Sequence, residues 1–156
     1  MTAHRLFVAV QWLLIGALAA CLLTGAGRAL LPANAAALGE ALRIVGLLLG
    51  VIAGGLAVAA FRALGRAMRI GPAPRPGMGL VTHGIYRRLR HPMYTAVVMV
   101  AVAAVLLRPT VGCAMSALAV IVFYLVKARY EEGLLRAAYP GYDAYRQRTH
   151  GVLPPL

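Results

Sequence analysis

The chain has 156 residues, of which 62% are apolar, and it carries 16 basic residues against only four acidic ones. Its length allows one domain, and its apolar fraction lies well above the roughly 45–50% of soluble domains, which argues against a soluble enzyme and against disorder. The formal charge of +12 favours a nucleic-acid partner only if the basic residues form one face of a soluble fold.

Two long uncharged stretches come first, Leu6 to Gly27 and Ile44 to Phe61. A helix needs about 20 apolar residues to cross a hydrocarbon core roughly 30 Å thick, so each stretch predicts a transmembrane helix. The first also resembles a lipoprotein signal that ends before Cys21. The apolar run continues beyond that cysteine, however, whereas a signal core has only about 7–15 residues. We therefore expect the first stretch to be a span.

The second stretch contains Gly46, Gly50 and Gly54 at four-residue spacing. Such a row of small residues lets another helix approach closely in lipid. Packing within the chain is the simpler expectation, and a dimer face is the alternative.

Two shorter uncharged stretches follow, Met93 to Leu107 and Thr110 to Val126, separated only by Arg108 and Pro109. Proline restricts the residue before it, so the junction predicts a tight helical hairpin with Arg108 at the far interface. A helix of about 15 residues reaches only some 22 Å, and the hairpin should tilt, thin the bilayer or be sheltered by protein.

The basic residues divide unevenly between the two sides of these four spans. Thirteen lie before the first span, between the second and third, or after the fourth, and three (Arg28, Arg43 and Arg108) lie on the other side. The positive-inside rule then places both termini and the central loop in the cytoplasm. The charge therefore indicates topology and contact with anionic headgroups, and no nucleic-acid partner is expected. Cys21 and Cys113 both fall within spans, so we expect neither a disulfide framework nor a metal site.

The central loop has an unusual composition. Gly71 to Gly79 holds three prolines and three glycines, which predicts an irregular, stiff segment. Gly84 to Tyr94 then concentrates three arginines, a histidine and two tyrosines just before the third span. An interfacial belt of arginine and tyrosine is one interpretation, and a binding site is the other.

Two of the four acids, Glu131 and Glu132, are adjacent and follow the fourth span closely. Charges near membrane depth cost a few kcal/mol each and favour a functional interpretation, although ion pairs with nearby arginines are an alternative. Adjacent residues point about 100° apart on a helix, so one carboxylate can bind a ligand while the other pairs with arginine.

Three ordered motifs now make the chain similar to a known family. They are Leu80-Val-Thr-x-Gly-x-Tyr86, Arg90-His-Pro-x-Tyr94 and Glu131-Glu132-x-x-Leu135-x-x-x-Tyr139-x-x-Tyr142-x-x-Tyr145-x-x-Arg148. Together they resemble the isoprenylcysteine carboxyl methyltransferases, integral membrane enzymes that use S-adenosylmethionine and are related to the phospholipid N-methyltransferases. The resemblance covers about residues 75 to 155.

The resemblance implies a role for particular residues. Those expected at the cofactor are Leu80, Val81, Tyr86, His91, Pro92, Met93, Tyr94, Glu131 and Glu132, and those expected to orient the acceptor are Arg90 and Lys127. Three positions depart from the family pattern: Ala96 stands where glycine is frequent, Tyr139-Pro140 matches the bacterial branch, and Lys127 replaces an arginine. A lysine offers a point charge in place of a bidentate fork.

The residue chemistry fits this reaction independently. A carboxylate such as Glu131 attracts a sulfonium and an ammonium, and tyrosine faces can lie against the cation or the adenine. A carboxylate acceptor is already ionised at neutral pH and needs no base. A phenol or an amine acceptor needs a proton removed, and His91 is then the candidate base.

We therefore predict a single all-α integral membrane domain over residues 1–156 with four transmembrane helices. Residues 1–64 form two spans, 65–92 the cytoplasmic loop, 93–126 the hairpin, and 127–156 a cytoplasmic C-terminal segment whose helix completes the cofactor site with the loop. The predicted reaction transfers a methyl group from S-adenosylmethionine, giving S-adenosylhomocysteine, to a lipophilic acceptor that arrives from the bilayer.

The acceptor itself stays open. A prenylated cysteine carboxylate is the nominal choice, with a phospholipid amine or a lipid phenol as alternatives. From another class, the chain could be a non-catalytic membrane accessory or lipid-binding protein. Fifteen arginines against one lysine indicate a GC-rich bacterial genome, and hence the inner membrane. The sequence does not predict an oligomeric state.

Overall fold

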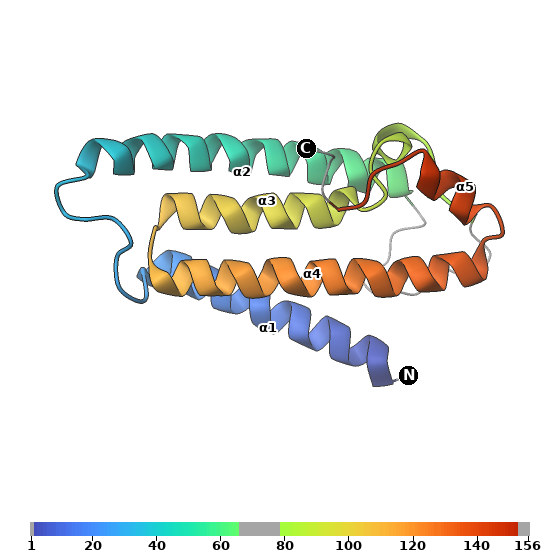
Figure 1. Cartoon of the computed structure of the whole chain (residues 1–156), viewed down its shortest axis with the longest axis horizontal. Helices are drawn as coiled ribbons and strands as arrows, with labels where there is room; N and C mark the ends of the chain where they lie inside the picture. The colour runs from blue at the N-terminus through green and yellow to red at the C-terminus, as the bar shows by residue number, and fades with distance from the viewer. Residues whose placement is uncertain (1, 66–78, 153–156) are drawn as a thin grey trace.

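The computed structural model describes residues 2–65 and 79–152, and in this part of the chain the regular structure is helical. The elements are α1 (Thr2–Thr24), α2 (Ala36–Leu64), the 3-10 helix η2 (Gly84–Arg87), α3 (Pro92–Leu107), α4 (Val111–Ala138) and α5 (Tyr142–Gln147) (Figure 1). The expectation of an all-α fold is confirmed. Nearly all of the proline-rich and glycine-rich segment from Gly71 to Gly79, together with Arg66, Arg69 and Arg75, lies outside the described residues.

Three helices within the described ranges are long and apolar enough to cross a membrane: α1, α2 and α4. Helix α3 is equally apolar but has 16 residues, which gives it a length of about 24 Å. Three of the four predicted spans are thus supported, and the fourth stays a prediction.

The four long helices lie side by side in the order α2, α3, α4, α1 (Figure 1). Helix α3 occupies the centre because its buried positions are mostly small: Ala96, Ala101, Ala103 and Ala104 are all at most 4% exposed. Small side chains let neighbouring helices approach closely where lipid provides no hydrophobic drive between them. A cluster that includes Leu18, Ala101, Val120 and Tyr124 joins α1, α3 and α4.

The predicted glycine row of α2 divides between two environments. Gly46 is buried against α3, where an added Cβ would lie 3.1 Å from the Ala103 carbonyl oxygen, whereas Cβ atoms at Gly50 and Gly54 would meet open space. The first glycine therefore packs within the chain, as the simpler interpretation expects. At the other two glycines an added side chain would have room.

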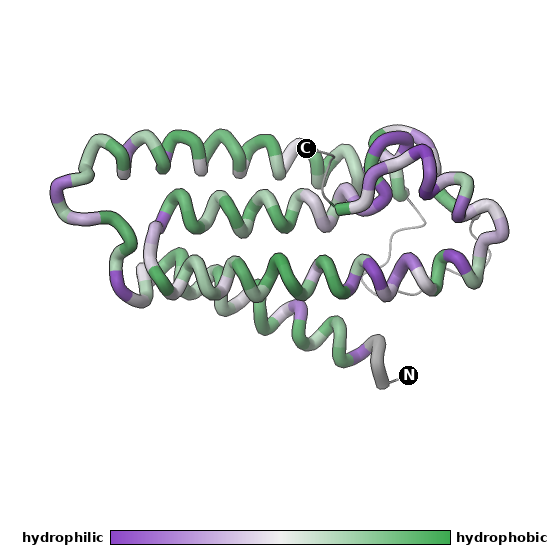
Figure 2. Tube along the Cα trace, in the orientation of Figure 1, coloured by the Kyte–Doolittle hydropathy of each residue, from purple (hydrophilic) through white to green (hydrophobic). Residues whose placement is uncertain are grey.

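The hydrophilic residues gather at the end of the bundle where α4 and α5 meet (Figure 2). We call this the polar end and define it by residues 84–91 and 127–151. Helix α1 begins on this side, α2 ends there and α3 begins there (Figure 1). The opposite end is formed by residues 25–35 and 108–110.

Helix α4 continues beyond Val126, where the uncharged stretch ends. It has 28 residues, about 42 Å, and continues through the acid pair to Ala138. Residues 127–138 are mostly good helix formers, and the first proline after them is Pro140, so nothing stops the helix earlier. The C-terminal helix of the prediction is consequently short: α5 has six residues.

Candidate functional site

Arg90, in the stretch between η2 and α3, joins the separate segments of the polar end. Its Nε donates to Glu132 Oε1 at 2.8 Å, and its Nη1 donates to the carbonyl oxygens of Arg146, at 2.9 Å, and Thr149. The side chain is only 11% exposed. Hydrogen bonds between charged groups are roughly twice as strong as neutral ones, so Arg90 holds α4, α5 and the C-terminal segment together.

The C-terminal segment also pairs with the backbone before α3. Arg90 N donates to the His150 carbonyl at 2.8 Å, and His150 N donates to the Arg88 carbonyl at 2.9 Å. Two residues further, the Thr95 hydroxyl on α3 donates to the Val152 carbonyl at 2.5 Å. Residues 149–152 therefore form a strap across the start of α3.

Thr95→Val should loosen this strap while leaving α3 in place. Valine has a similar shape but leaves the buried Val152 carbonyl without its donor, and the amide hydrogen of His150 should exchange about ten-fold faster. Hydrogen–deuterium exchange measures this directly. Thr24→Val is the matched control, since the Thr24 hydroxyl bonds only its own helix, at the Ala20 carbonyl, and is exposed. Unchanged exchange at His150 would show that Thr95 does not anchor the strap.

Glu132 lies among two arginines and a histidine. Besides Arg90 on Oε1, Arg146 Nε lies 3.5 Å from Oε2, and His91 Nε2 lies 3.4 Å from Oε1. The carboxylate thus carries much of the charge pairing of the polar end. This is the pairing with arginine that the adjacent-acid geometry predicts for one member of the pair.

Glu131 faces a different set of groups. The Tyr94 hydroxyl on α3 donates to its Oε2 at 2.6 Å, and His91 Nδ1 lies 3.8 Å from the same oxygen. The His91 and Tyr94 rings stack with centroids 5.3 Å apart. Glu131 therefore has aromatic and imidazole neighbours and no arginine within ion-pair distance among the described residues, which leaves its negative charge less compensated than that of Glu132.

Lys127 lies one turn before Glu131 on α4 and is 1% exposed. Its Nζ donates to Gln11 Oε1 on α1 at 2.5 Å and lies 5.3 Å from the centroid of the Tyr94 ring. Measured along α4 from Val111, Lys127 is about 24 Å and Glu131 about 30 Å into the helix. If Val111 lies at one interface, Glu131 reaches the other and the ammonium remains inside the bilayer.

Three tyrosines of the polar end, Tyr86, Tyr142 and Tyr145, keep their hydroxyl protons. Burial raises the pKa of Tyr145 to about 12. Burial first, and then nearby glutamate charge, also raises the pKa of Tyr86 and of Tyr142. These groups therefore stay protonated at physiological pH and are available as donors. The Tyr145 hydroxyl donates to the Tyr86 carbonyl at 2.7 Å.

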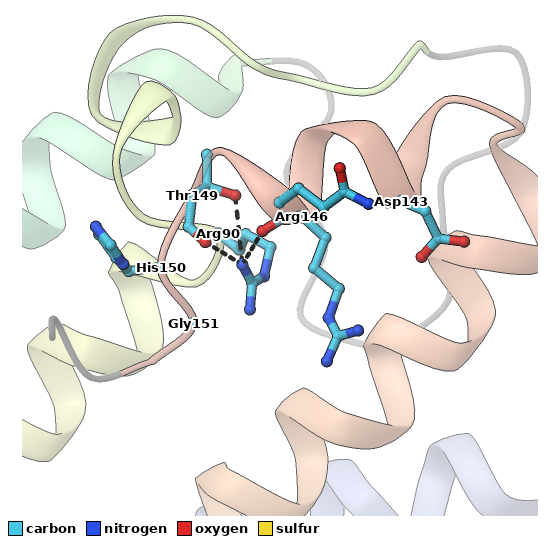
Figure 3. Close-up of a pocket in the computed structure, with 7 residues that line it drawn as sticks. Arg90, Asp143, Arg146, Thr149, His150 and Gly151 are labelled. Carbon is cyan, nitrogen blue, oxygen red and sulfur yellow. Dashed lines mark hydrogen bonds between the residues drawn. The ribbon is translucent and has the colours of Figure 1, made fainter.

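A hollow of about 630 Å³ opens beside Arg90. Its walls come from α5 and the strap, with Arg90 between them (Figure 3). The lining residues are Arg90, Asp143, Arg146, Gln147, Thr149, His150 and Gly151. Both arginines of this lining also pair with Glu132, so the hollow borders the charge pairs of the polar end.

Six of the predicted site residues are connected to one another in the structure, and the other five lie outside this network. Hydrogen bonds, ion pairs and ring contacts connect the six through the acid pair: Arg90, His91, Tyr94, Lys127, Glu131 and Glu132. Tyr86 is buried in η2, and its carbonyl accepts a hydrogen bond from the Tyr145 hydroxyl on α5. Pro92 is buried at the start of α3. Leu80, Val81 and Met93 are half-buried and contribute apolar surface near the same end.

Some residues that contact the polar end, or belong to it, were not predicted. Thr95 and Thr149 act through the strap, and Gln11 reaches the site from α1. Gln11 had a usable signal, because it is the only side-chain amide within the four predicted spans. The threonines had none, because their role depends on which segments meet in space.

The fold and this site define a helical membrane protein with a charge-paired polar site at one end of its bundle. The family model for phospholipid methyltransferase matches residues 41–141, and the chain belongs to that family. The family consists of membrane methyltransferases that act on lipid-like substrates, so the chain is a membrane methyltransferase. A search of the curated proteins finds no match.

Proposed function

We propose that the protein transfers a methyl group from S-adenosylmethionine to an ionised oxygen of a lipid-like acceptor, nominally the carboxylate of a prenylated cysteine. The observation that carries this proposal is the order of two charged side chains along α4. The carboxylate of Glu131 lies at the polar end, and the ammonium of Lys127 lies one turn deeper, with Tyr94 touching both. A cationic cofactor from the cytosol and an anionic acceptor from the bilayer would each meet a complementary charge.

The residues of the polar end fit such a cofactor. Two buried polar atoms, His91 Nε2 and the Tyr142 hydroxyl, lack a hydrogen-bond partner in the described part of the chain. Buried polar atoms normally have partners, and a ligand with amino, carboxylate and hydroxyl groups would supply them. Glu131 would then face the positive groups, with Glu132 held by Arg90 as its companion.

When bound, the cofactor supplies an electrophilic methyl group: an acceptor lone pair forms the new bond to carbon, and the electrons of the S–C bond stay on sulfur, giving S-adenosylhomocysteine. The protein's part is mostly to position the acceptor. Lys127 and Arg90 would orient its charged oxygen. An ionised carboxylate has no proton to lose, so His91 need not act as a base with this acceptor.

A phospholipid amine is the second candidate acceptor, and the description of the matched family favours it. An amine must lose a proton before or during methylation. His91, buried between the two carboxylates, would then be the residue to accept it. The lysine ammonium beside Tyr94 favours an anionic acceptor over a cationic one.

We also propose that α3 crosses the bilayer as the fourth span and that the whole chain forms one domain. The residues around Arg90 and the strap would shelter the start of this short helix from the bilayer. The excess of basic residues at the polar end supports a cytoplasmic location for that end and for both termini. The arginine-rich composition supports a bacterial inner membrane and the bacterial branch of the isoprenylcysteine carboxyl methyltransferases.

The acceptor chemistry can be tested with methyl-labelled S-adenosylmethionine. Membranes that contain the protein should incorporate label into a lipid fraction, and alkali should release that label as methanol if the product is an ester. An N-methyl product or an aryl ether retains the label. Full retention would eliminate the carboxylate acceptor, and no incorporation above membranes without the protein, across all lipid fractions, would contradict methyl transfer.

A further inference from the structure

Gln11 is a buried polar residue in the middle of an apolar helix. It lies on α1, is 9% exposed, and accepts a hydrogen bond from Lys127 Nζ on α4 at 2.5 Å. Polar groups at membrane depth are costly and are usually paired or functional. Helix α1 lies outside the residues that the family model matches, which begin at 41, so the family match assigns this contact no role.

Contacts on both sides of Gln11 fix α1 against α4. Toward the polar end, the Phe7 ring stacks on Tyr130 with centroids 5.1 Å apart. Toward the other end, Cys21 Sγ and Ser116 Oγ lie 3.4 Å apart. The amide is therefore held opposite Lys127 by packing above and below it, and the hydrogen bond need not provide the helix contact.

The contact continues into the proposed site. Lys127 Nζ lies 5.3 Å from the Tyr94 ring and 5.6 Å from the Tyr124 ring, and the Tyr94 hydroxyl bonds Glu131. Gln11 thus lies at the deep end of a polar row that runs through Lys127 and Tyr94 to Glu131. Because its Oε1 faces the ammonium, Gln11 fixes where that ammonium lies, and its amide adds two N–H donors at the same depth.

We infer that Gln11 is a positioning residue of the acceptor site, which holds the Lys127 amine so that it receives an ionised oxygen of the acceptor headgroup. The inference rests on the proposed function and adds the deep wall of the site, with a residue from α1. The oxygen could belong to a carboxylate or to a phosphate ester, and both share the charge and acceptor capacity that an ammonium and an amide recognise.

The first experiment measures the Gln11–Lys127 coupling without any methyl transfer. Thermal unfolding of the full chain in detergent is compared for wild type, Gln11→Met, Lys127→Met and the double variant. Gln11→Met removes an acceptor from a buried ammonium, whereas the double variant removes both polar groups, so it should unfold at a higher temperature than Gln11→Met. Additive losses would overturn the inference, whatever the protein's activity.

The second experiment separates positioning from packing. Methyl transfer is measured in parallel with a carboxylate lipid and with a phospholipid amine as the acceptor. Gln11→Met should raise the KM about ten-fold for whichever acceptor places an ionised oxygen at Lys127. The Kd for S-adenosylmethionine should stay unchanged, because Glu131 is untouched. Leu13→Met, at an exposed position on the same helix, is the control and should change neither constant.

Gln11→Glu distinguishes the two roles further. It keeps an oxygen for Lys127 and should retain stability, yet it neutralises the ammonium and should raise the acceptor KM as Gln11→Met does. A normal acceptor KM in Gln11→Glu would reduce Gln11 to a packing role. If wild-type protein transfers no methyl group, the proposed function fails, while the unfolding comparison still decides the coupling.

Discussion

Glu131→Gln should weaken the binding of S-adenosylmethionine about 100-fold or more while the protein stays folded. The substitution keeps an oxygen that can accept the Tyr94 hydroxyl, now 2.6 Å from Glu131 Oε2, so the helix contact survives. It removes the negative charge that a sulfonium and an ammonium would meet in a partly desolvated site. Losing one partner of such a charge pair weakens binding by about 100-fold or more.

Titration of S-adenosylmethionine into detergent-solubilised protein, followed by calorimetry, measures this loss. Glu40→Gln is the matched control: it makes the same chemical change on α2, in an exposed ion pair with Arg43, and should bind as wild type does. Equal affinity in Glu131→Gln and wild type would remove Glu131 from the cofactor site, and a shared loss in both variants would indicate a general effect of charge.

Gly112→Ala should destabilise the bundle by about 3 kcal/mol. Gly112 lies in the first turn of α4, where a Cβ would overlap the carbonyl oxygen of Ala26 in the loop after α1. Backbone hydrogen bonds hold that loop against the start of α4: Leu30 N donates to the Pro109 carbonyl and Val111 N to the Arg28 carbonyl. The overlap is with backbone, so no side chain can rotate away to relieve it.

Gly133→Ala provides the control on the same helix. A Cβ at Gly133 meets open space, so alanine should stabilise α4 by about 0.5–1 kcal/mol through its higher helix propensity. Thermal unfolding in detergent should therefore move in opposite directions for the two variants. A loss of stability at Gly133 equal to that at Gly112 would contradict the close backbone contact between α4 and the loop.

The helices could be predicted because each is encoded by its own residues. Uncharged runs mark α1, α2 and most of α4, and Arg108-Pro109 marks the turn between α3 and α4. The uncharged stretch ends at Val126, but the helix that contains it does not. A helix can continue into water when its residues favour it, and α4 does so through Glu131 and Glu132 to Ala138.

The candidate site was predictable only where its residues share one element. The 100° separation of Glu131 and Glu132 follows from helix geometry, and the structure shows the resulting division of partners. The contact of Gln11 with Lys127 spans 116 positions, and the strap pairs residues 149–152 with residues far earlier in the chain. Such contacts depend on which helices pack together, and no local pattern specifies that.

The backbone contact between the loop after α1 and the start of α4 has a consequence for the order of assembly. An added Cβ at Gly27 would lie only 2.8 Å from Gly112 N, so the first and last long helices meet directly although α2 and α3 are synthesised between them. Helices α2 and α3 are neighbours in the chain and in the bundle, so they can associate early, whereas the contact of α1 with α4 forms only once α4 has been synthesised. The contact between Gln11 and Lys127 therefore belongs to the last long-helix pairing that the chain can complete.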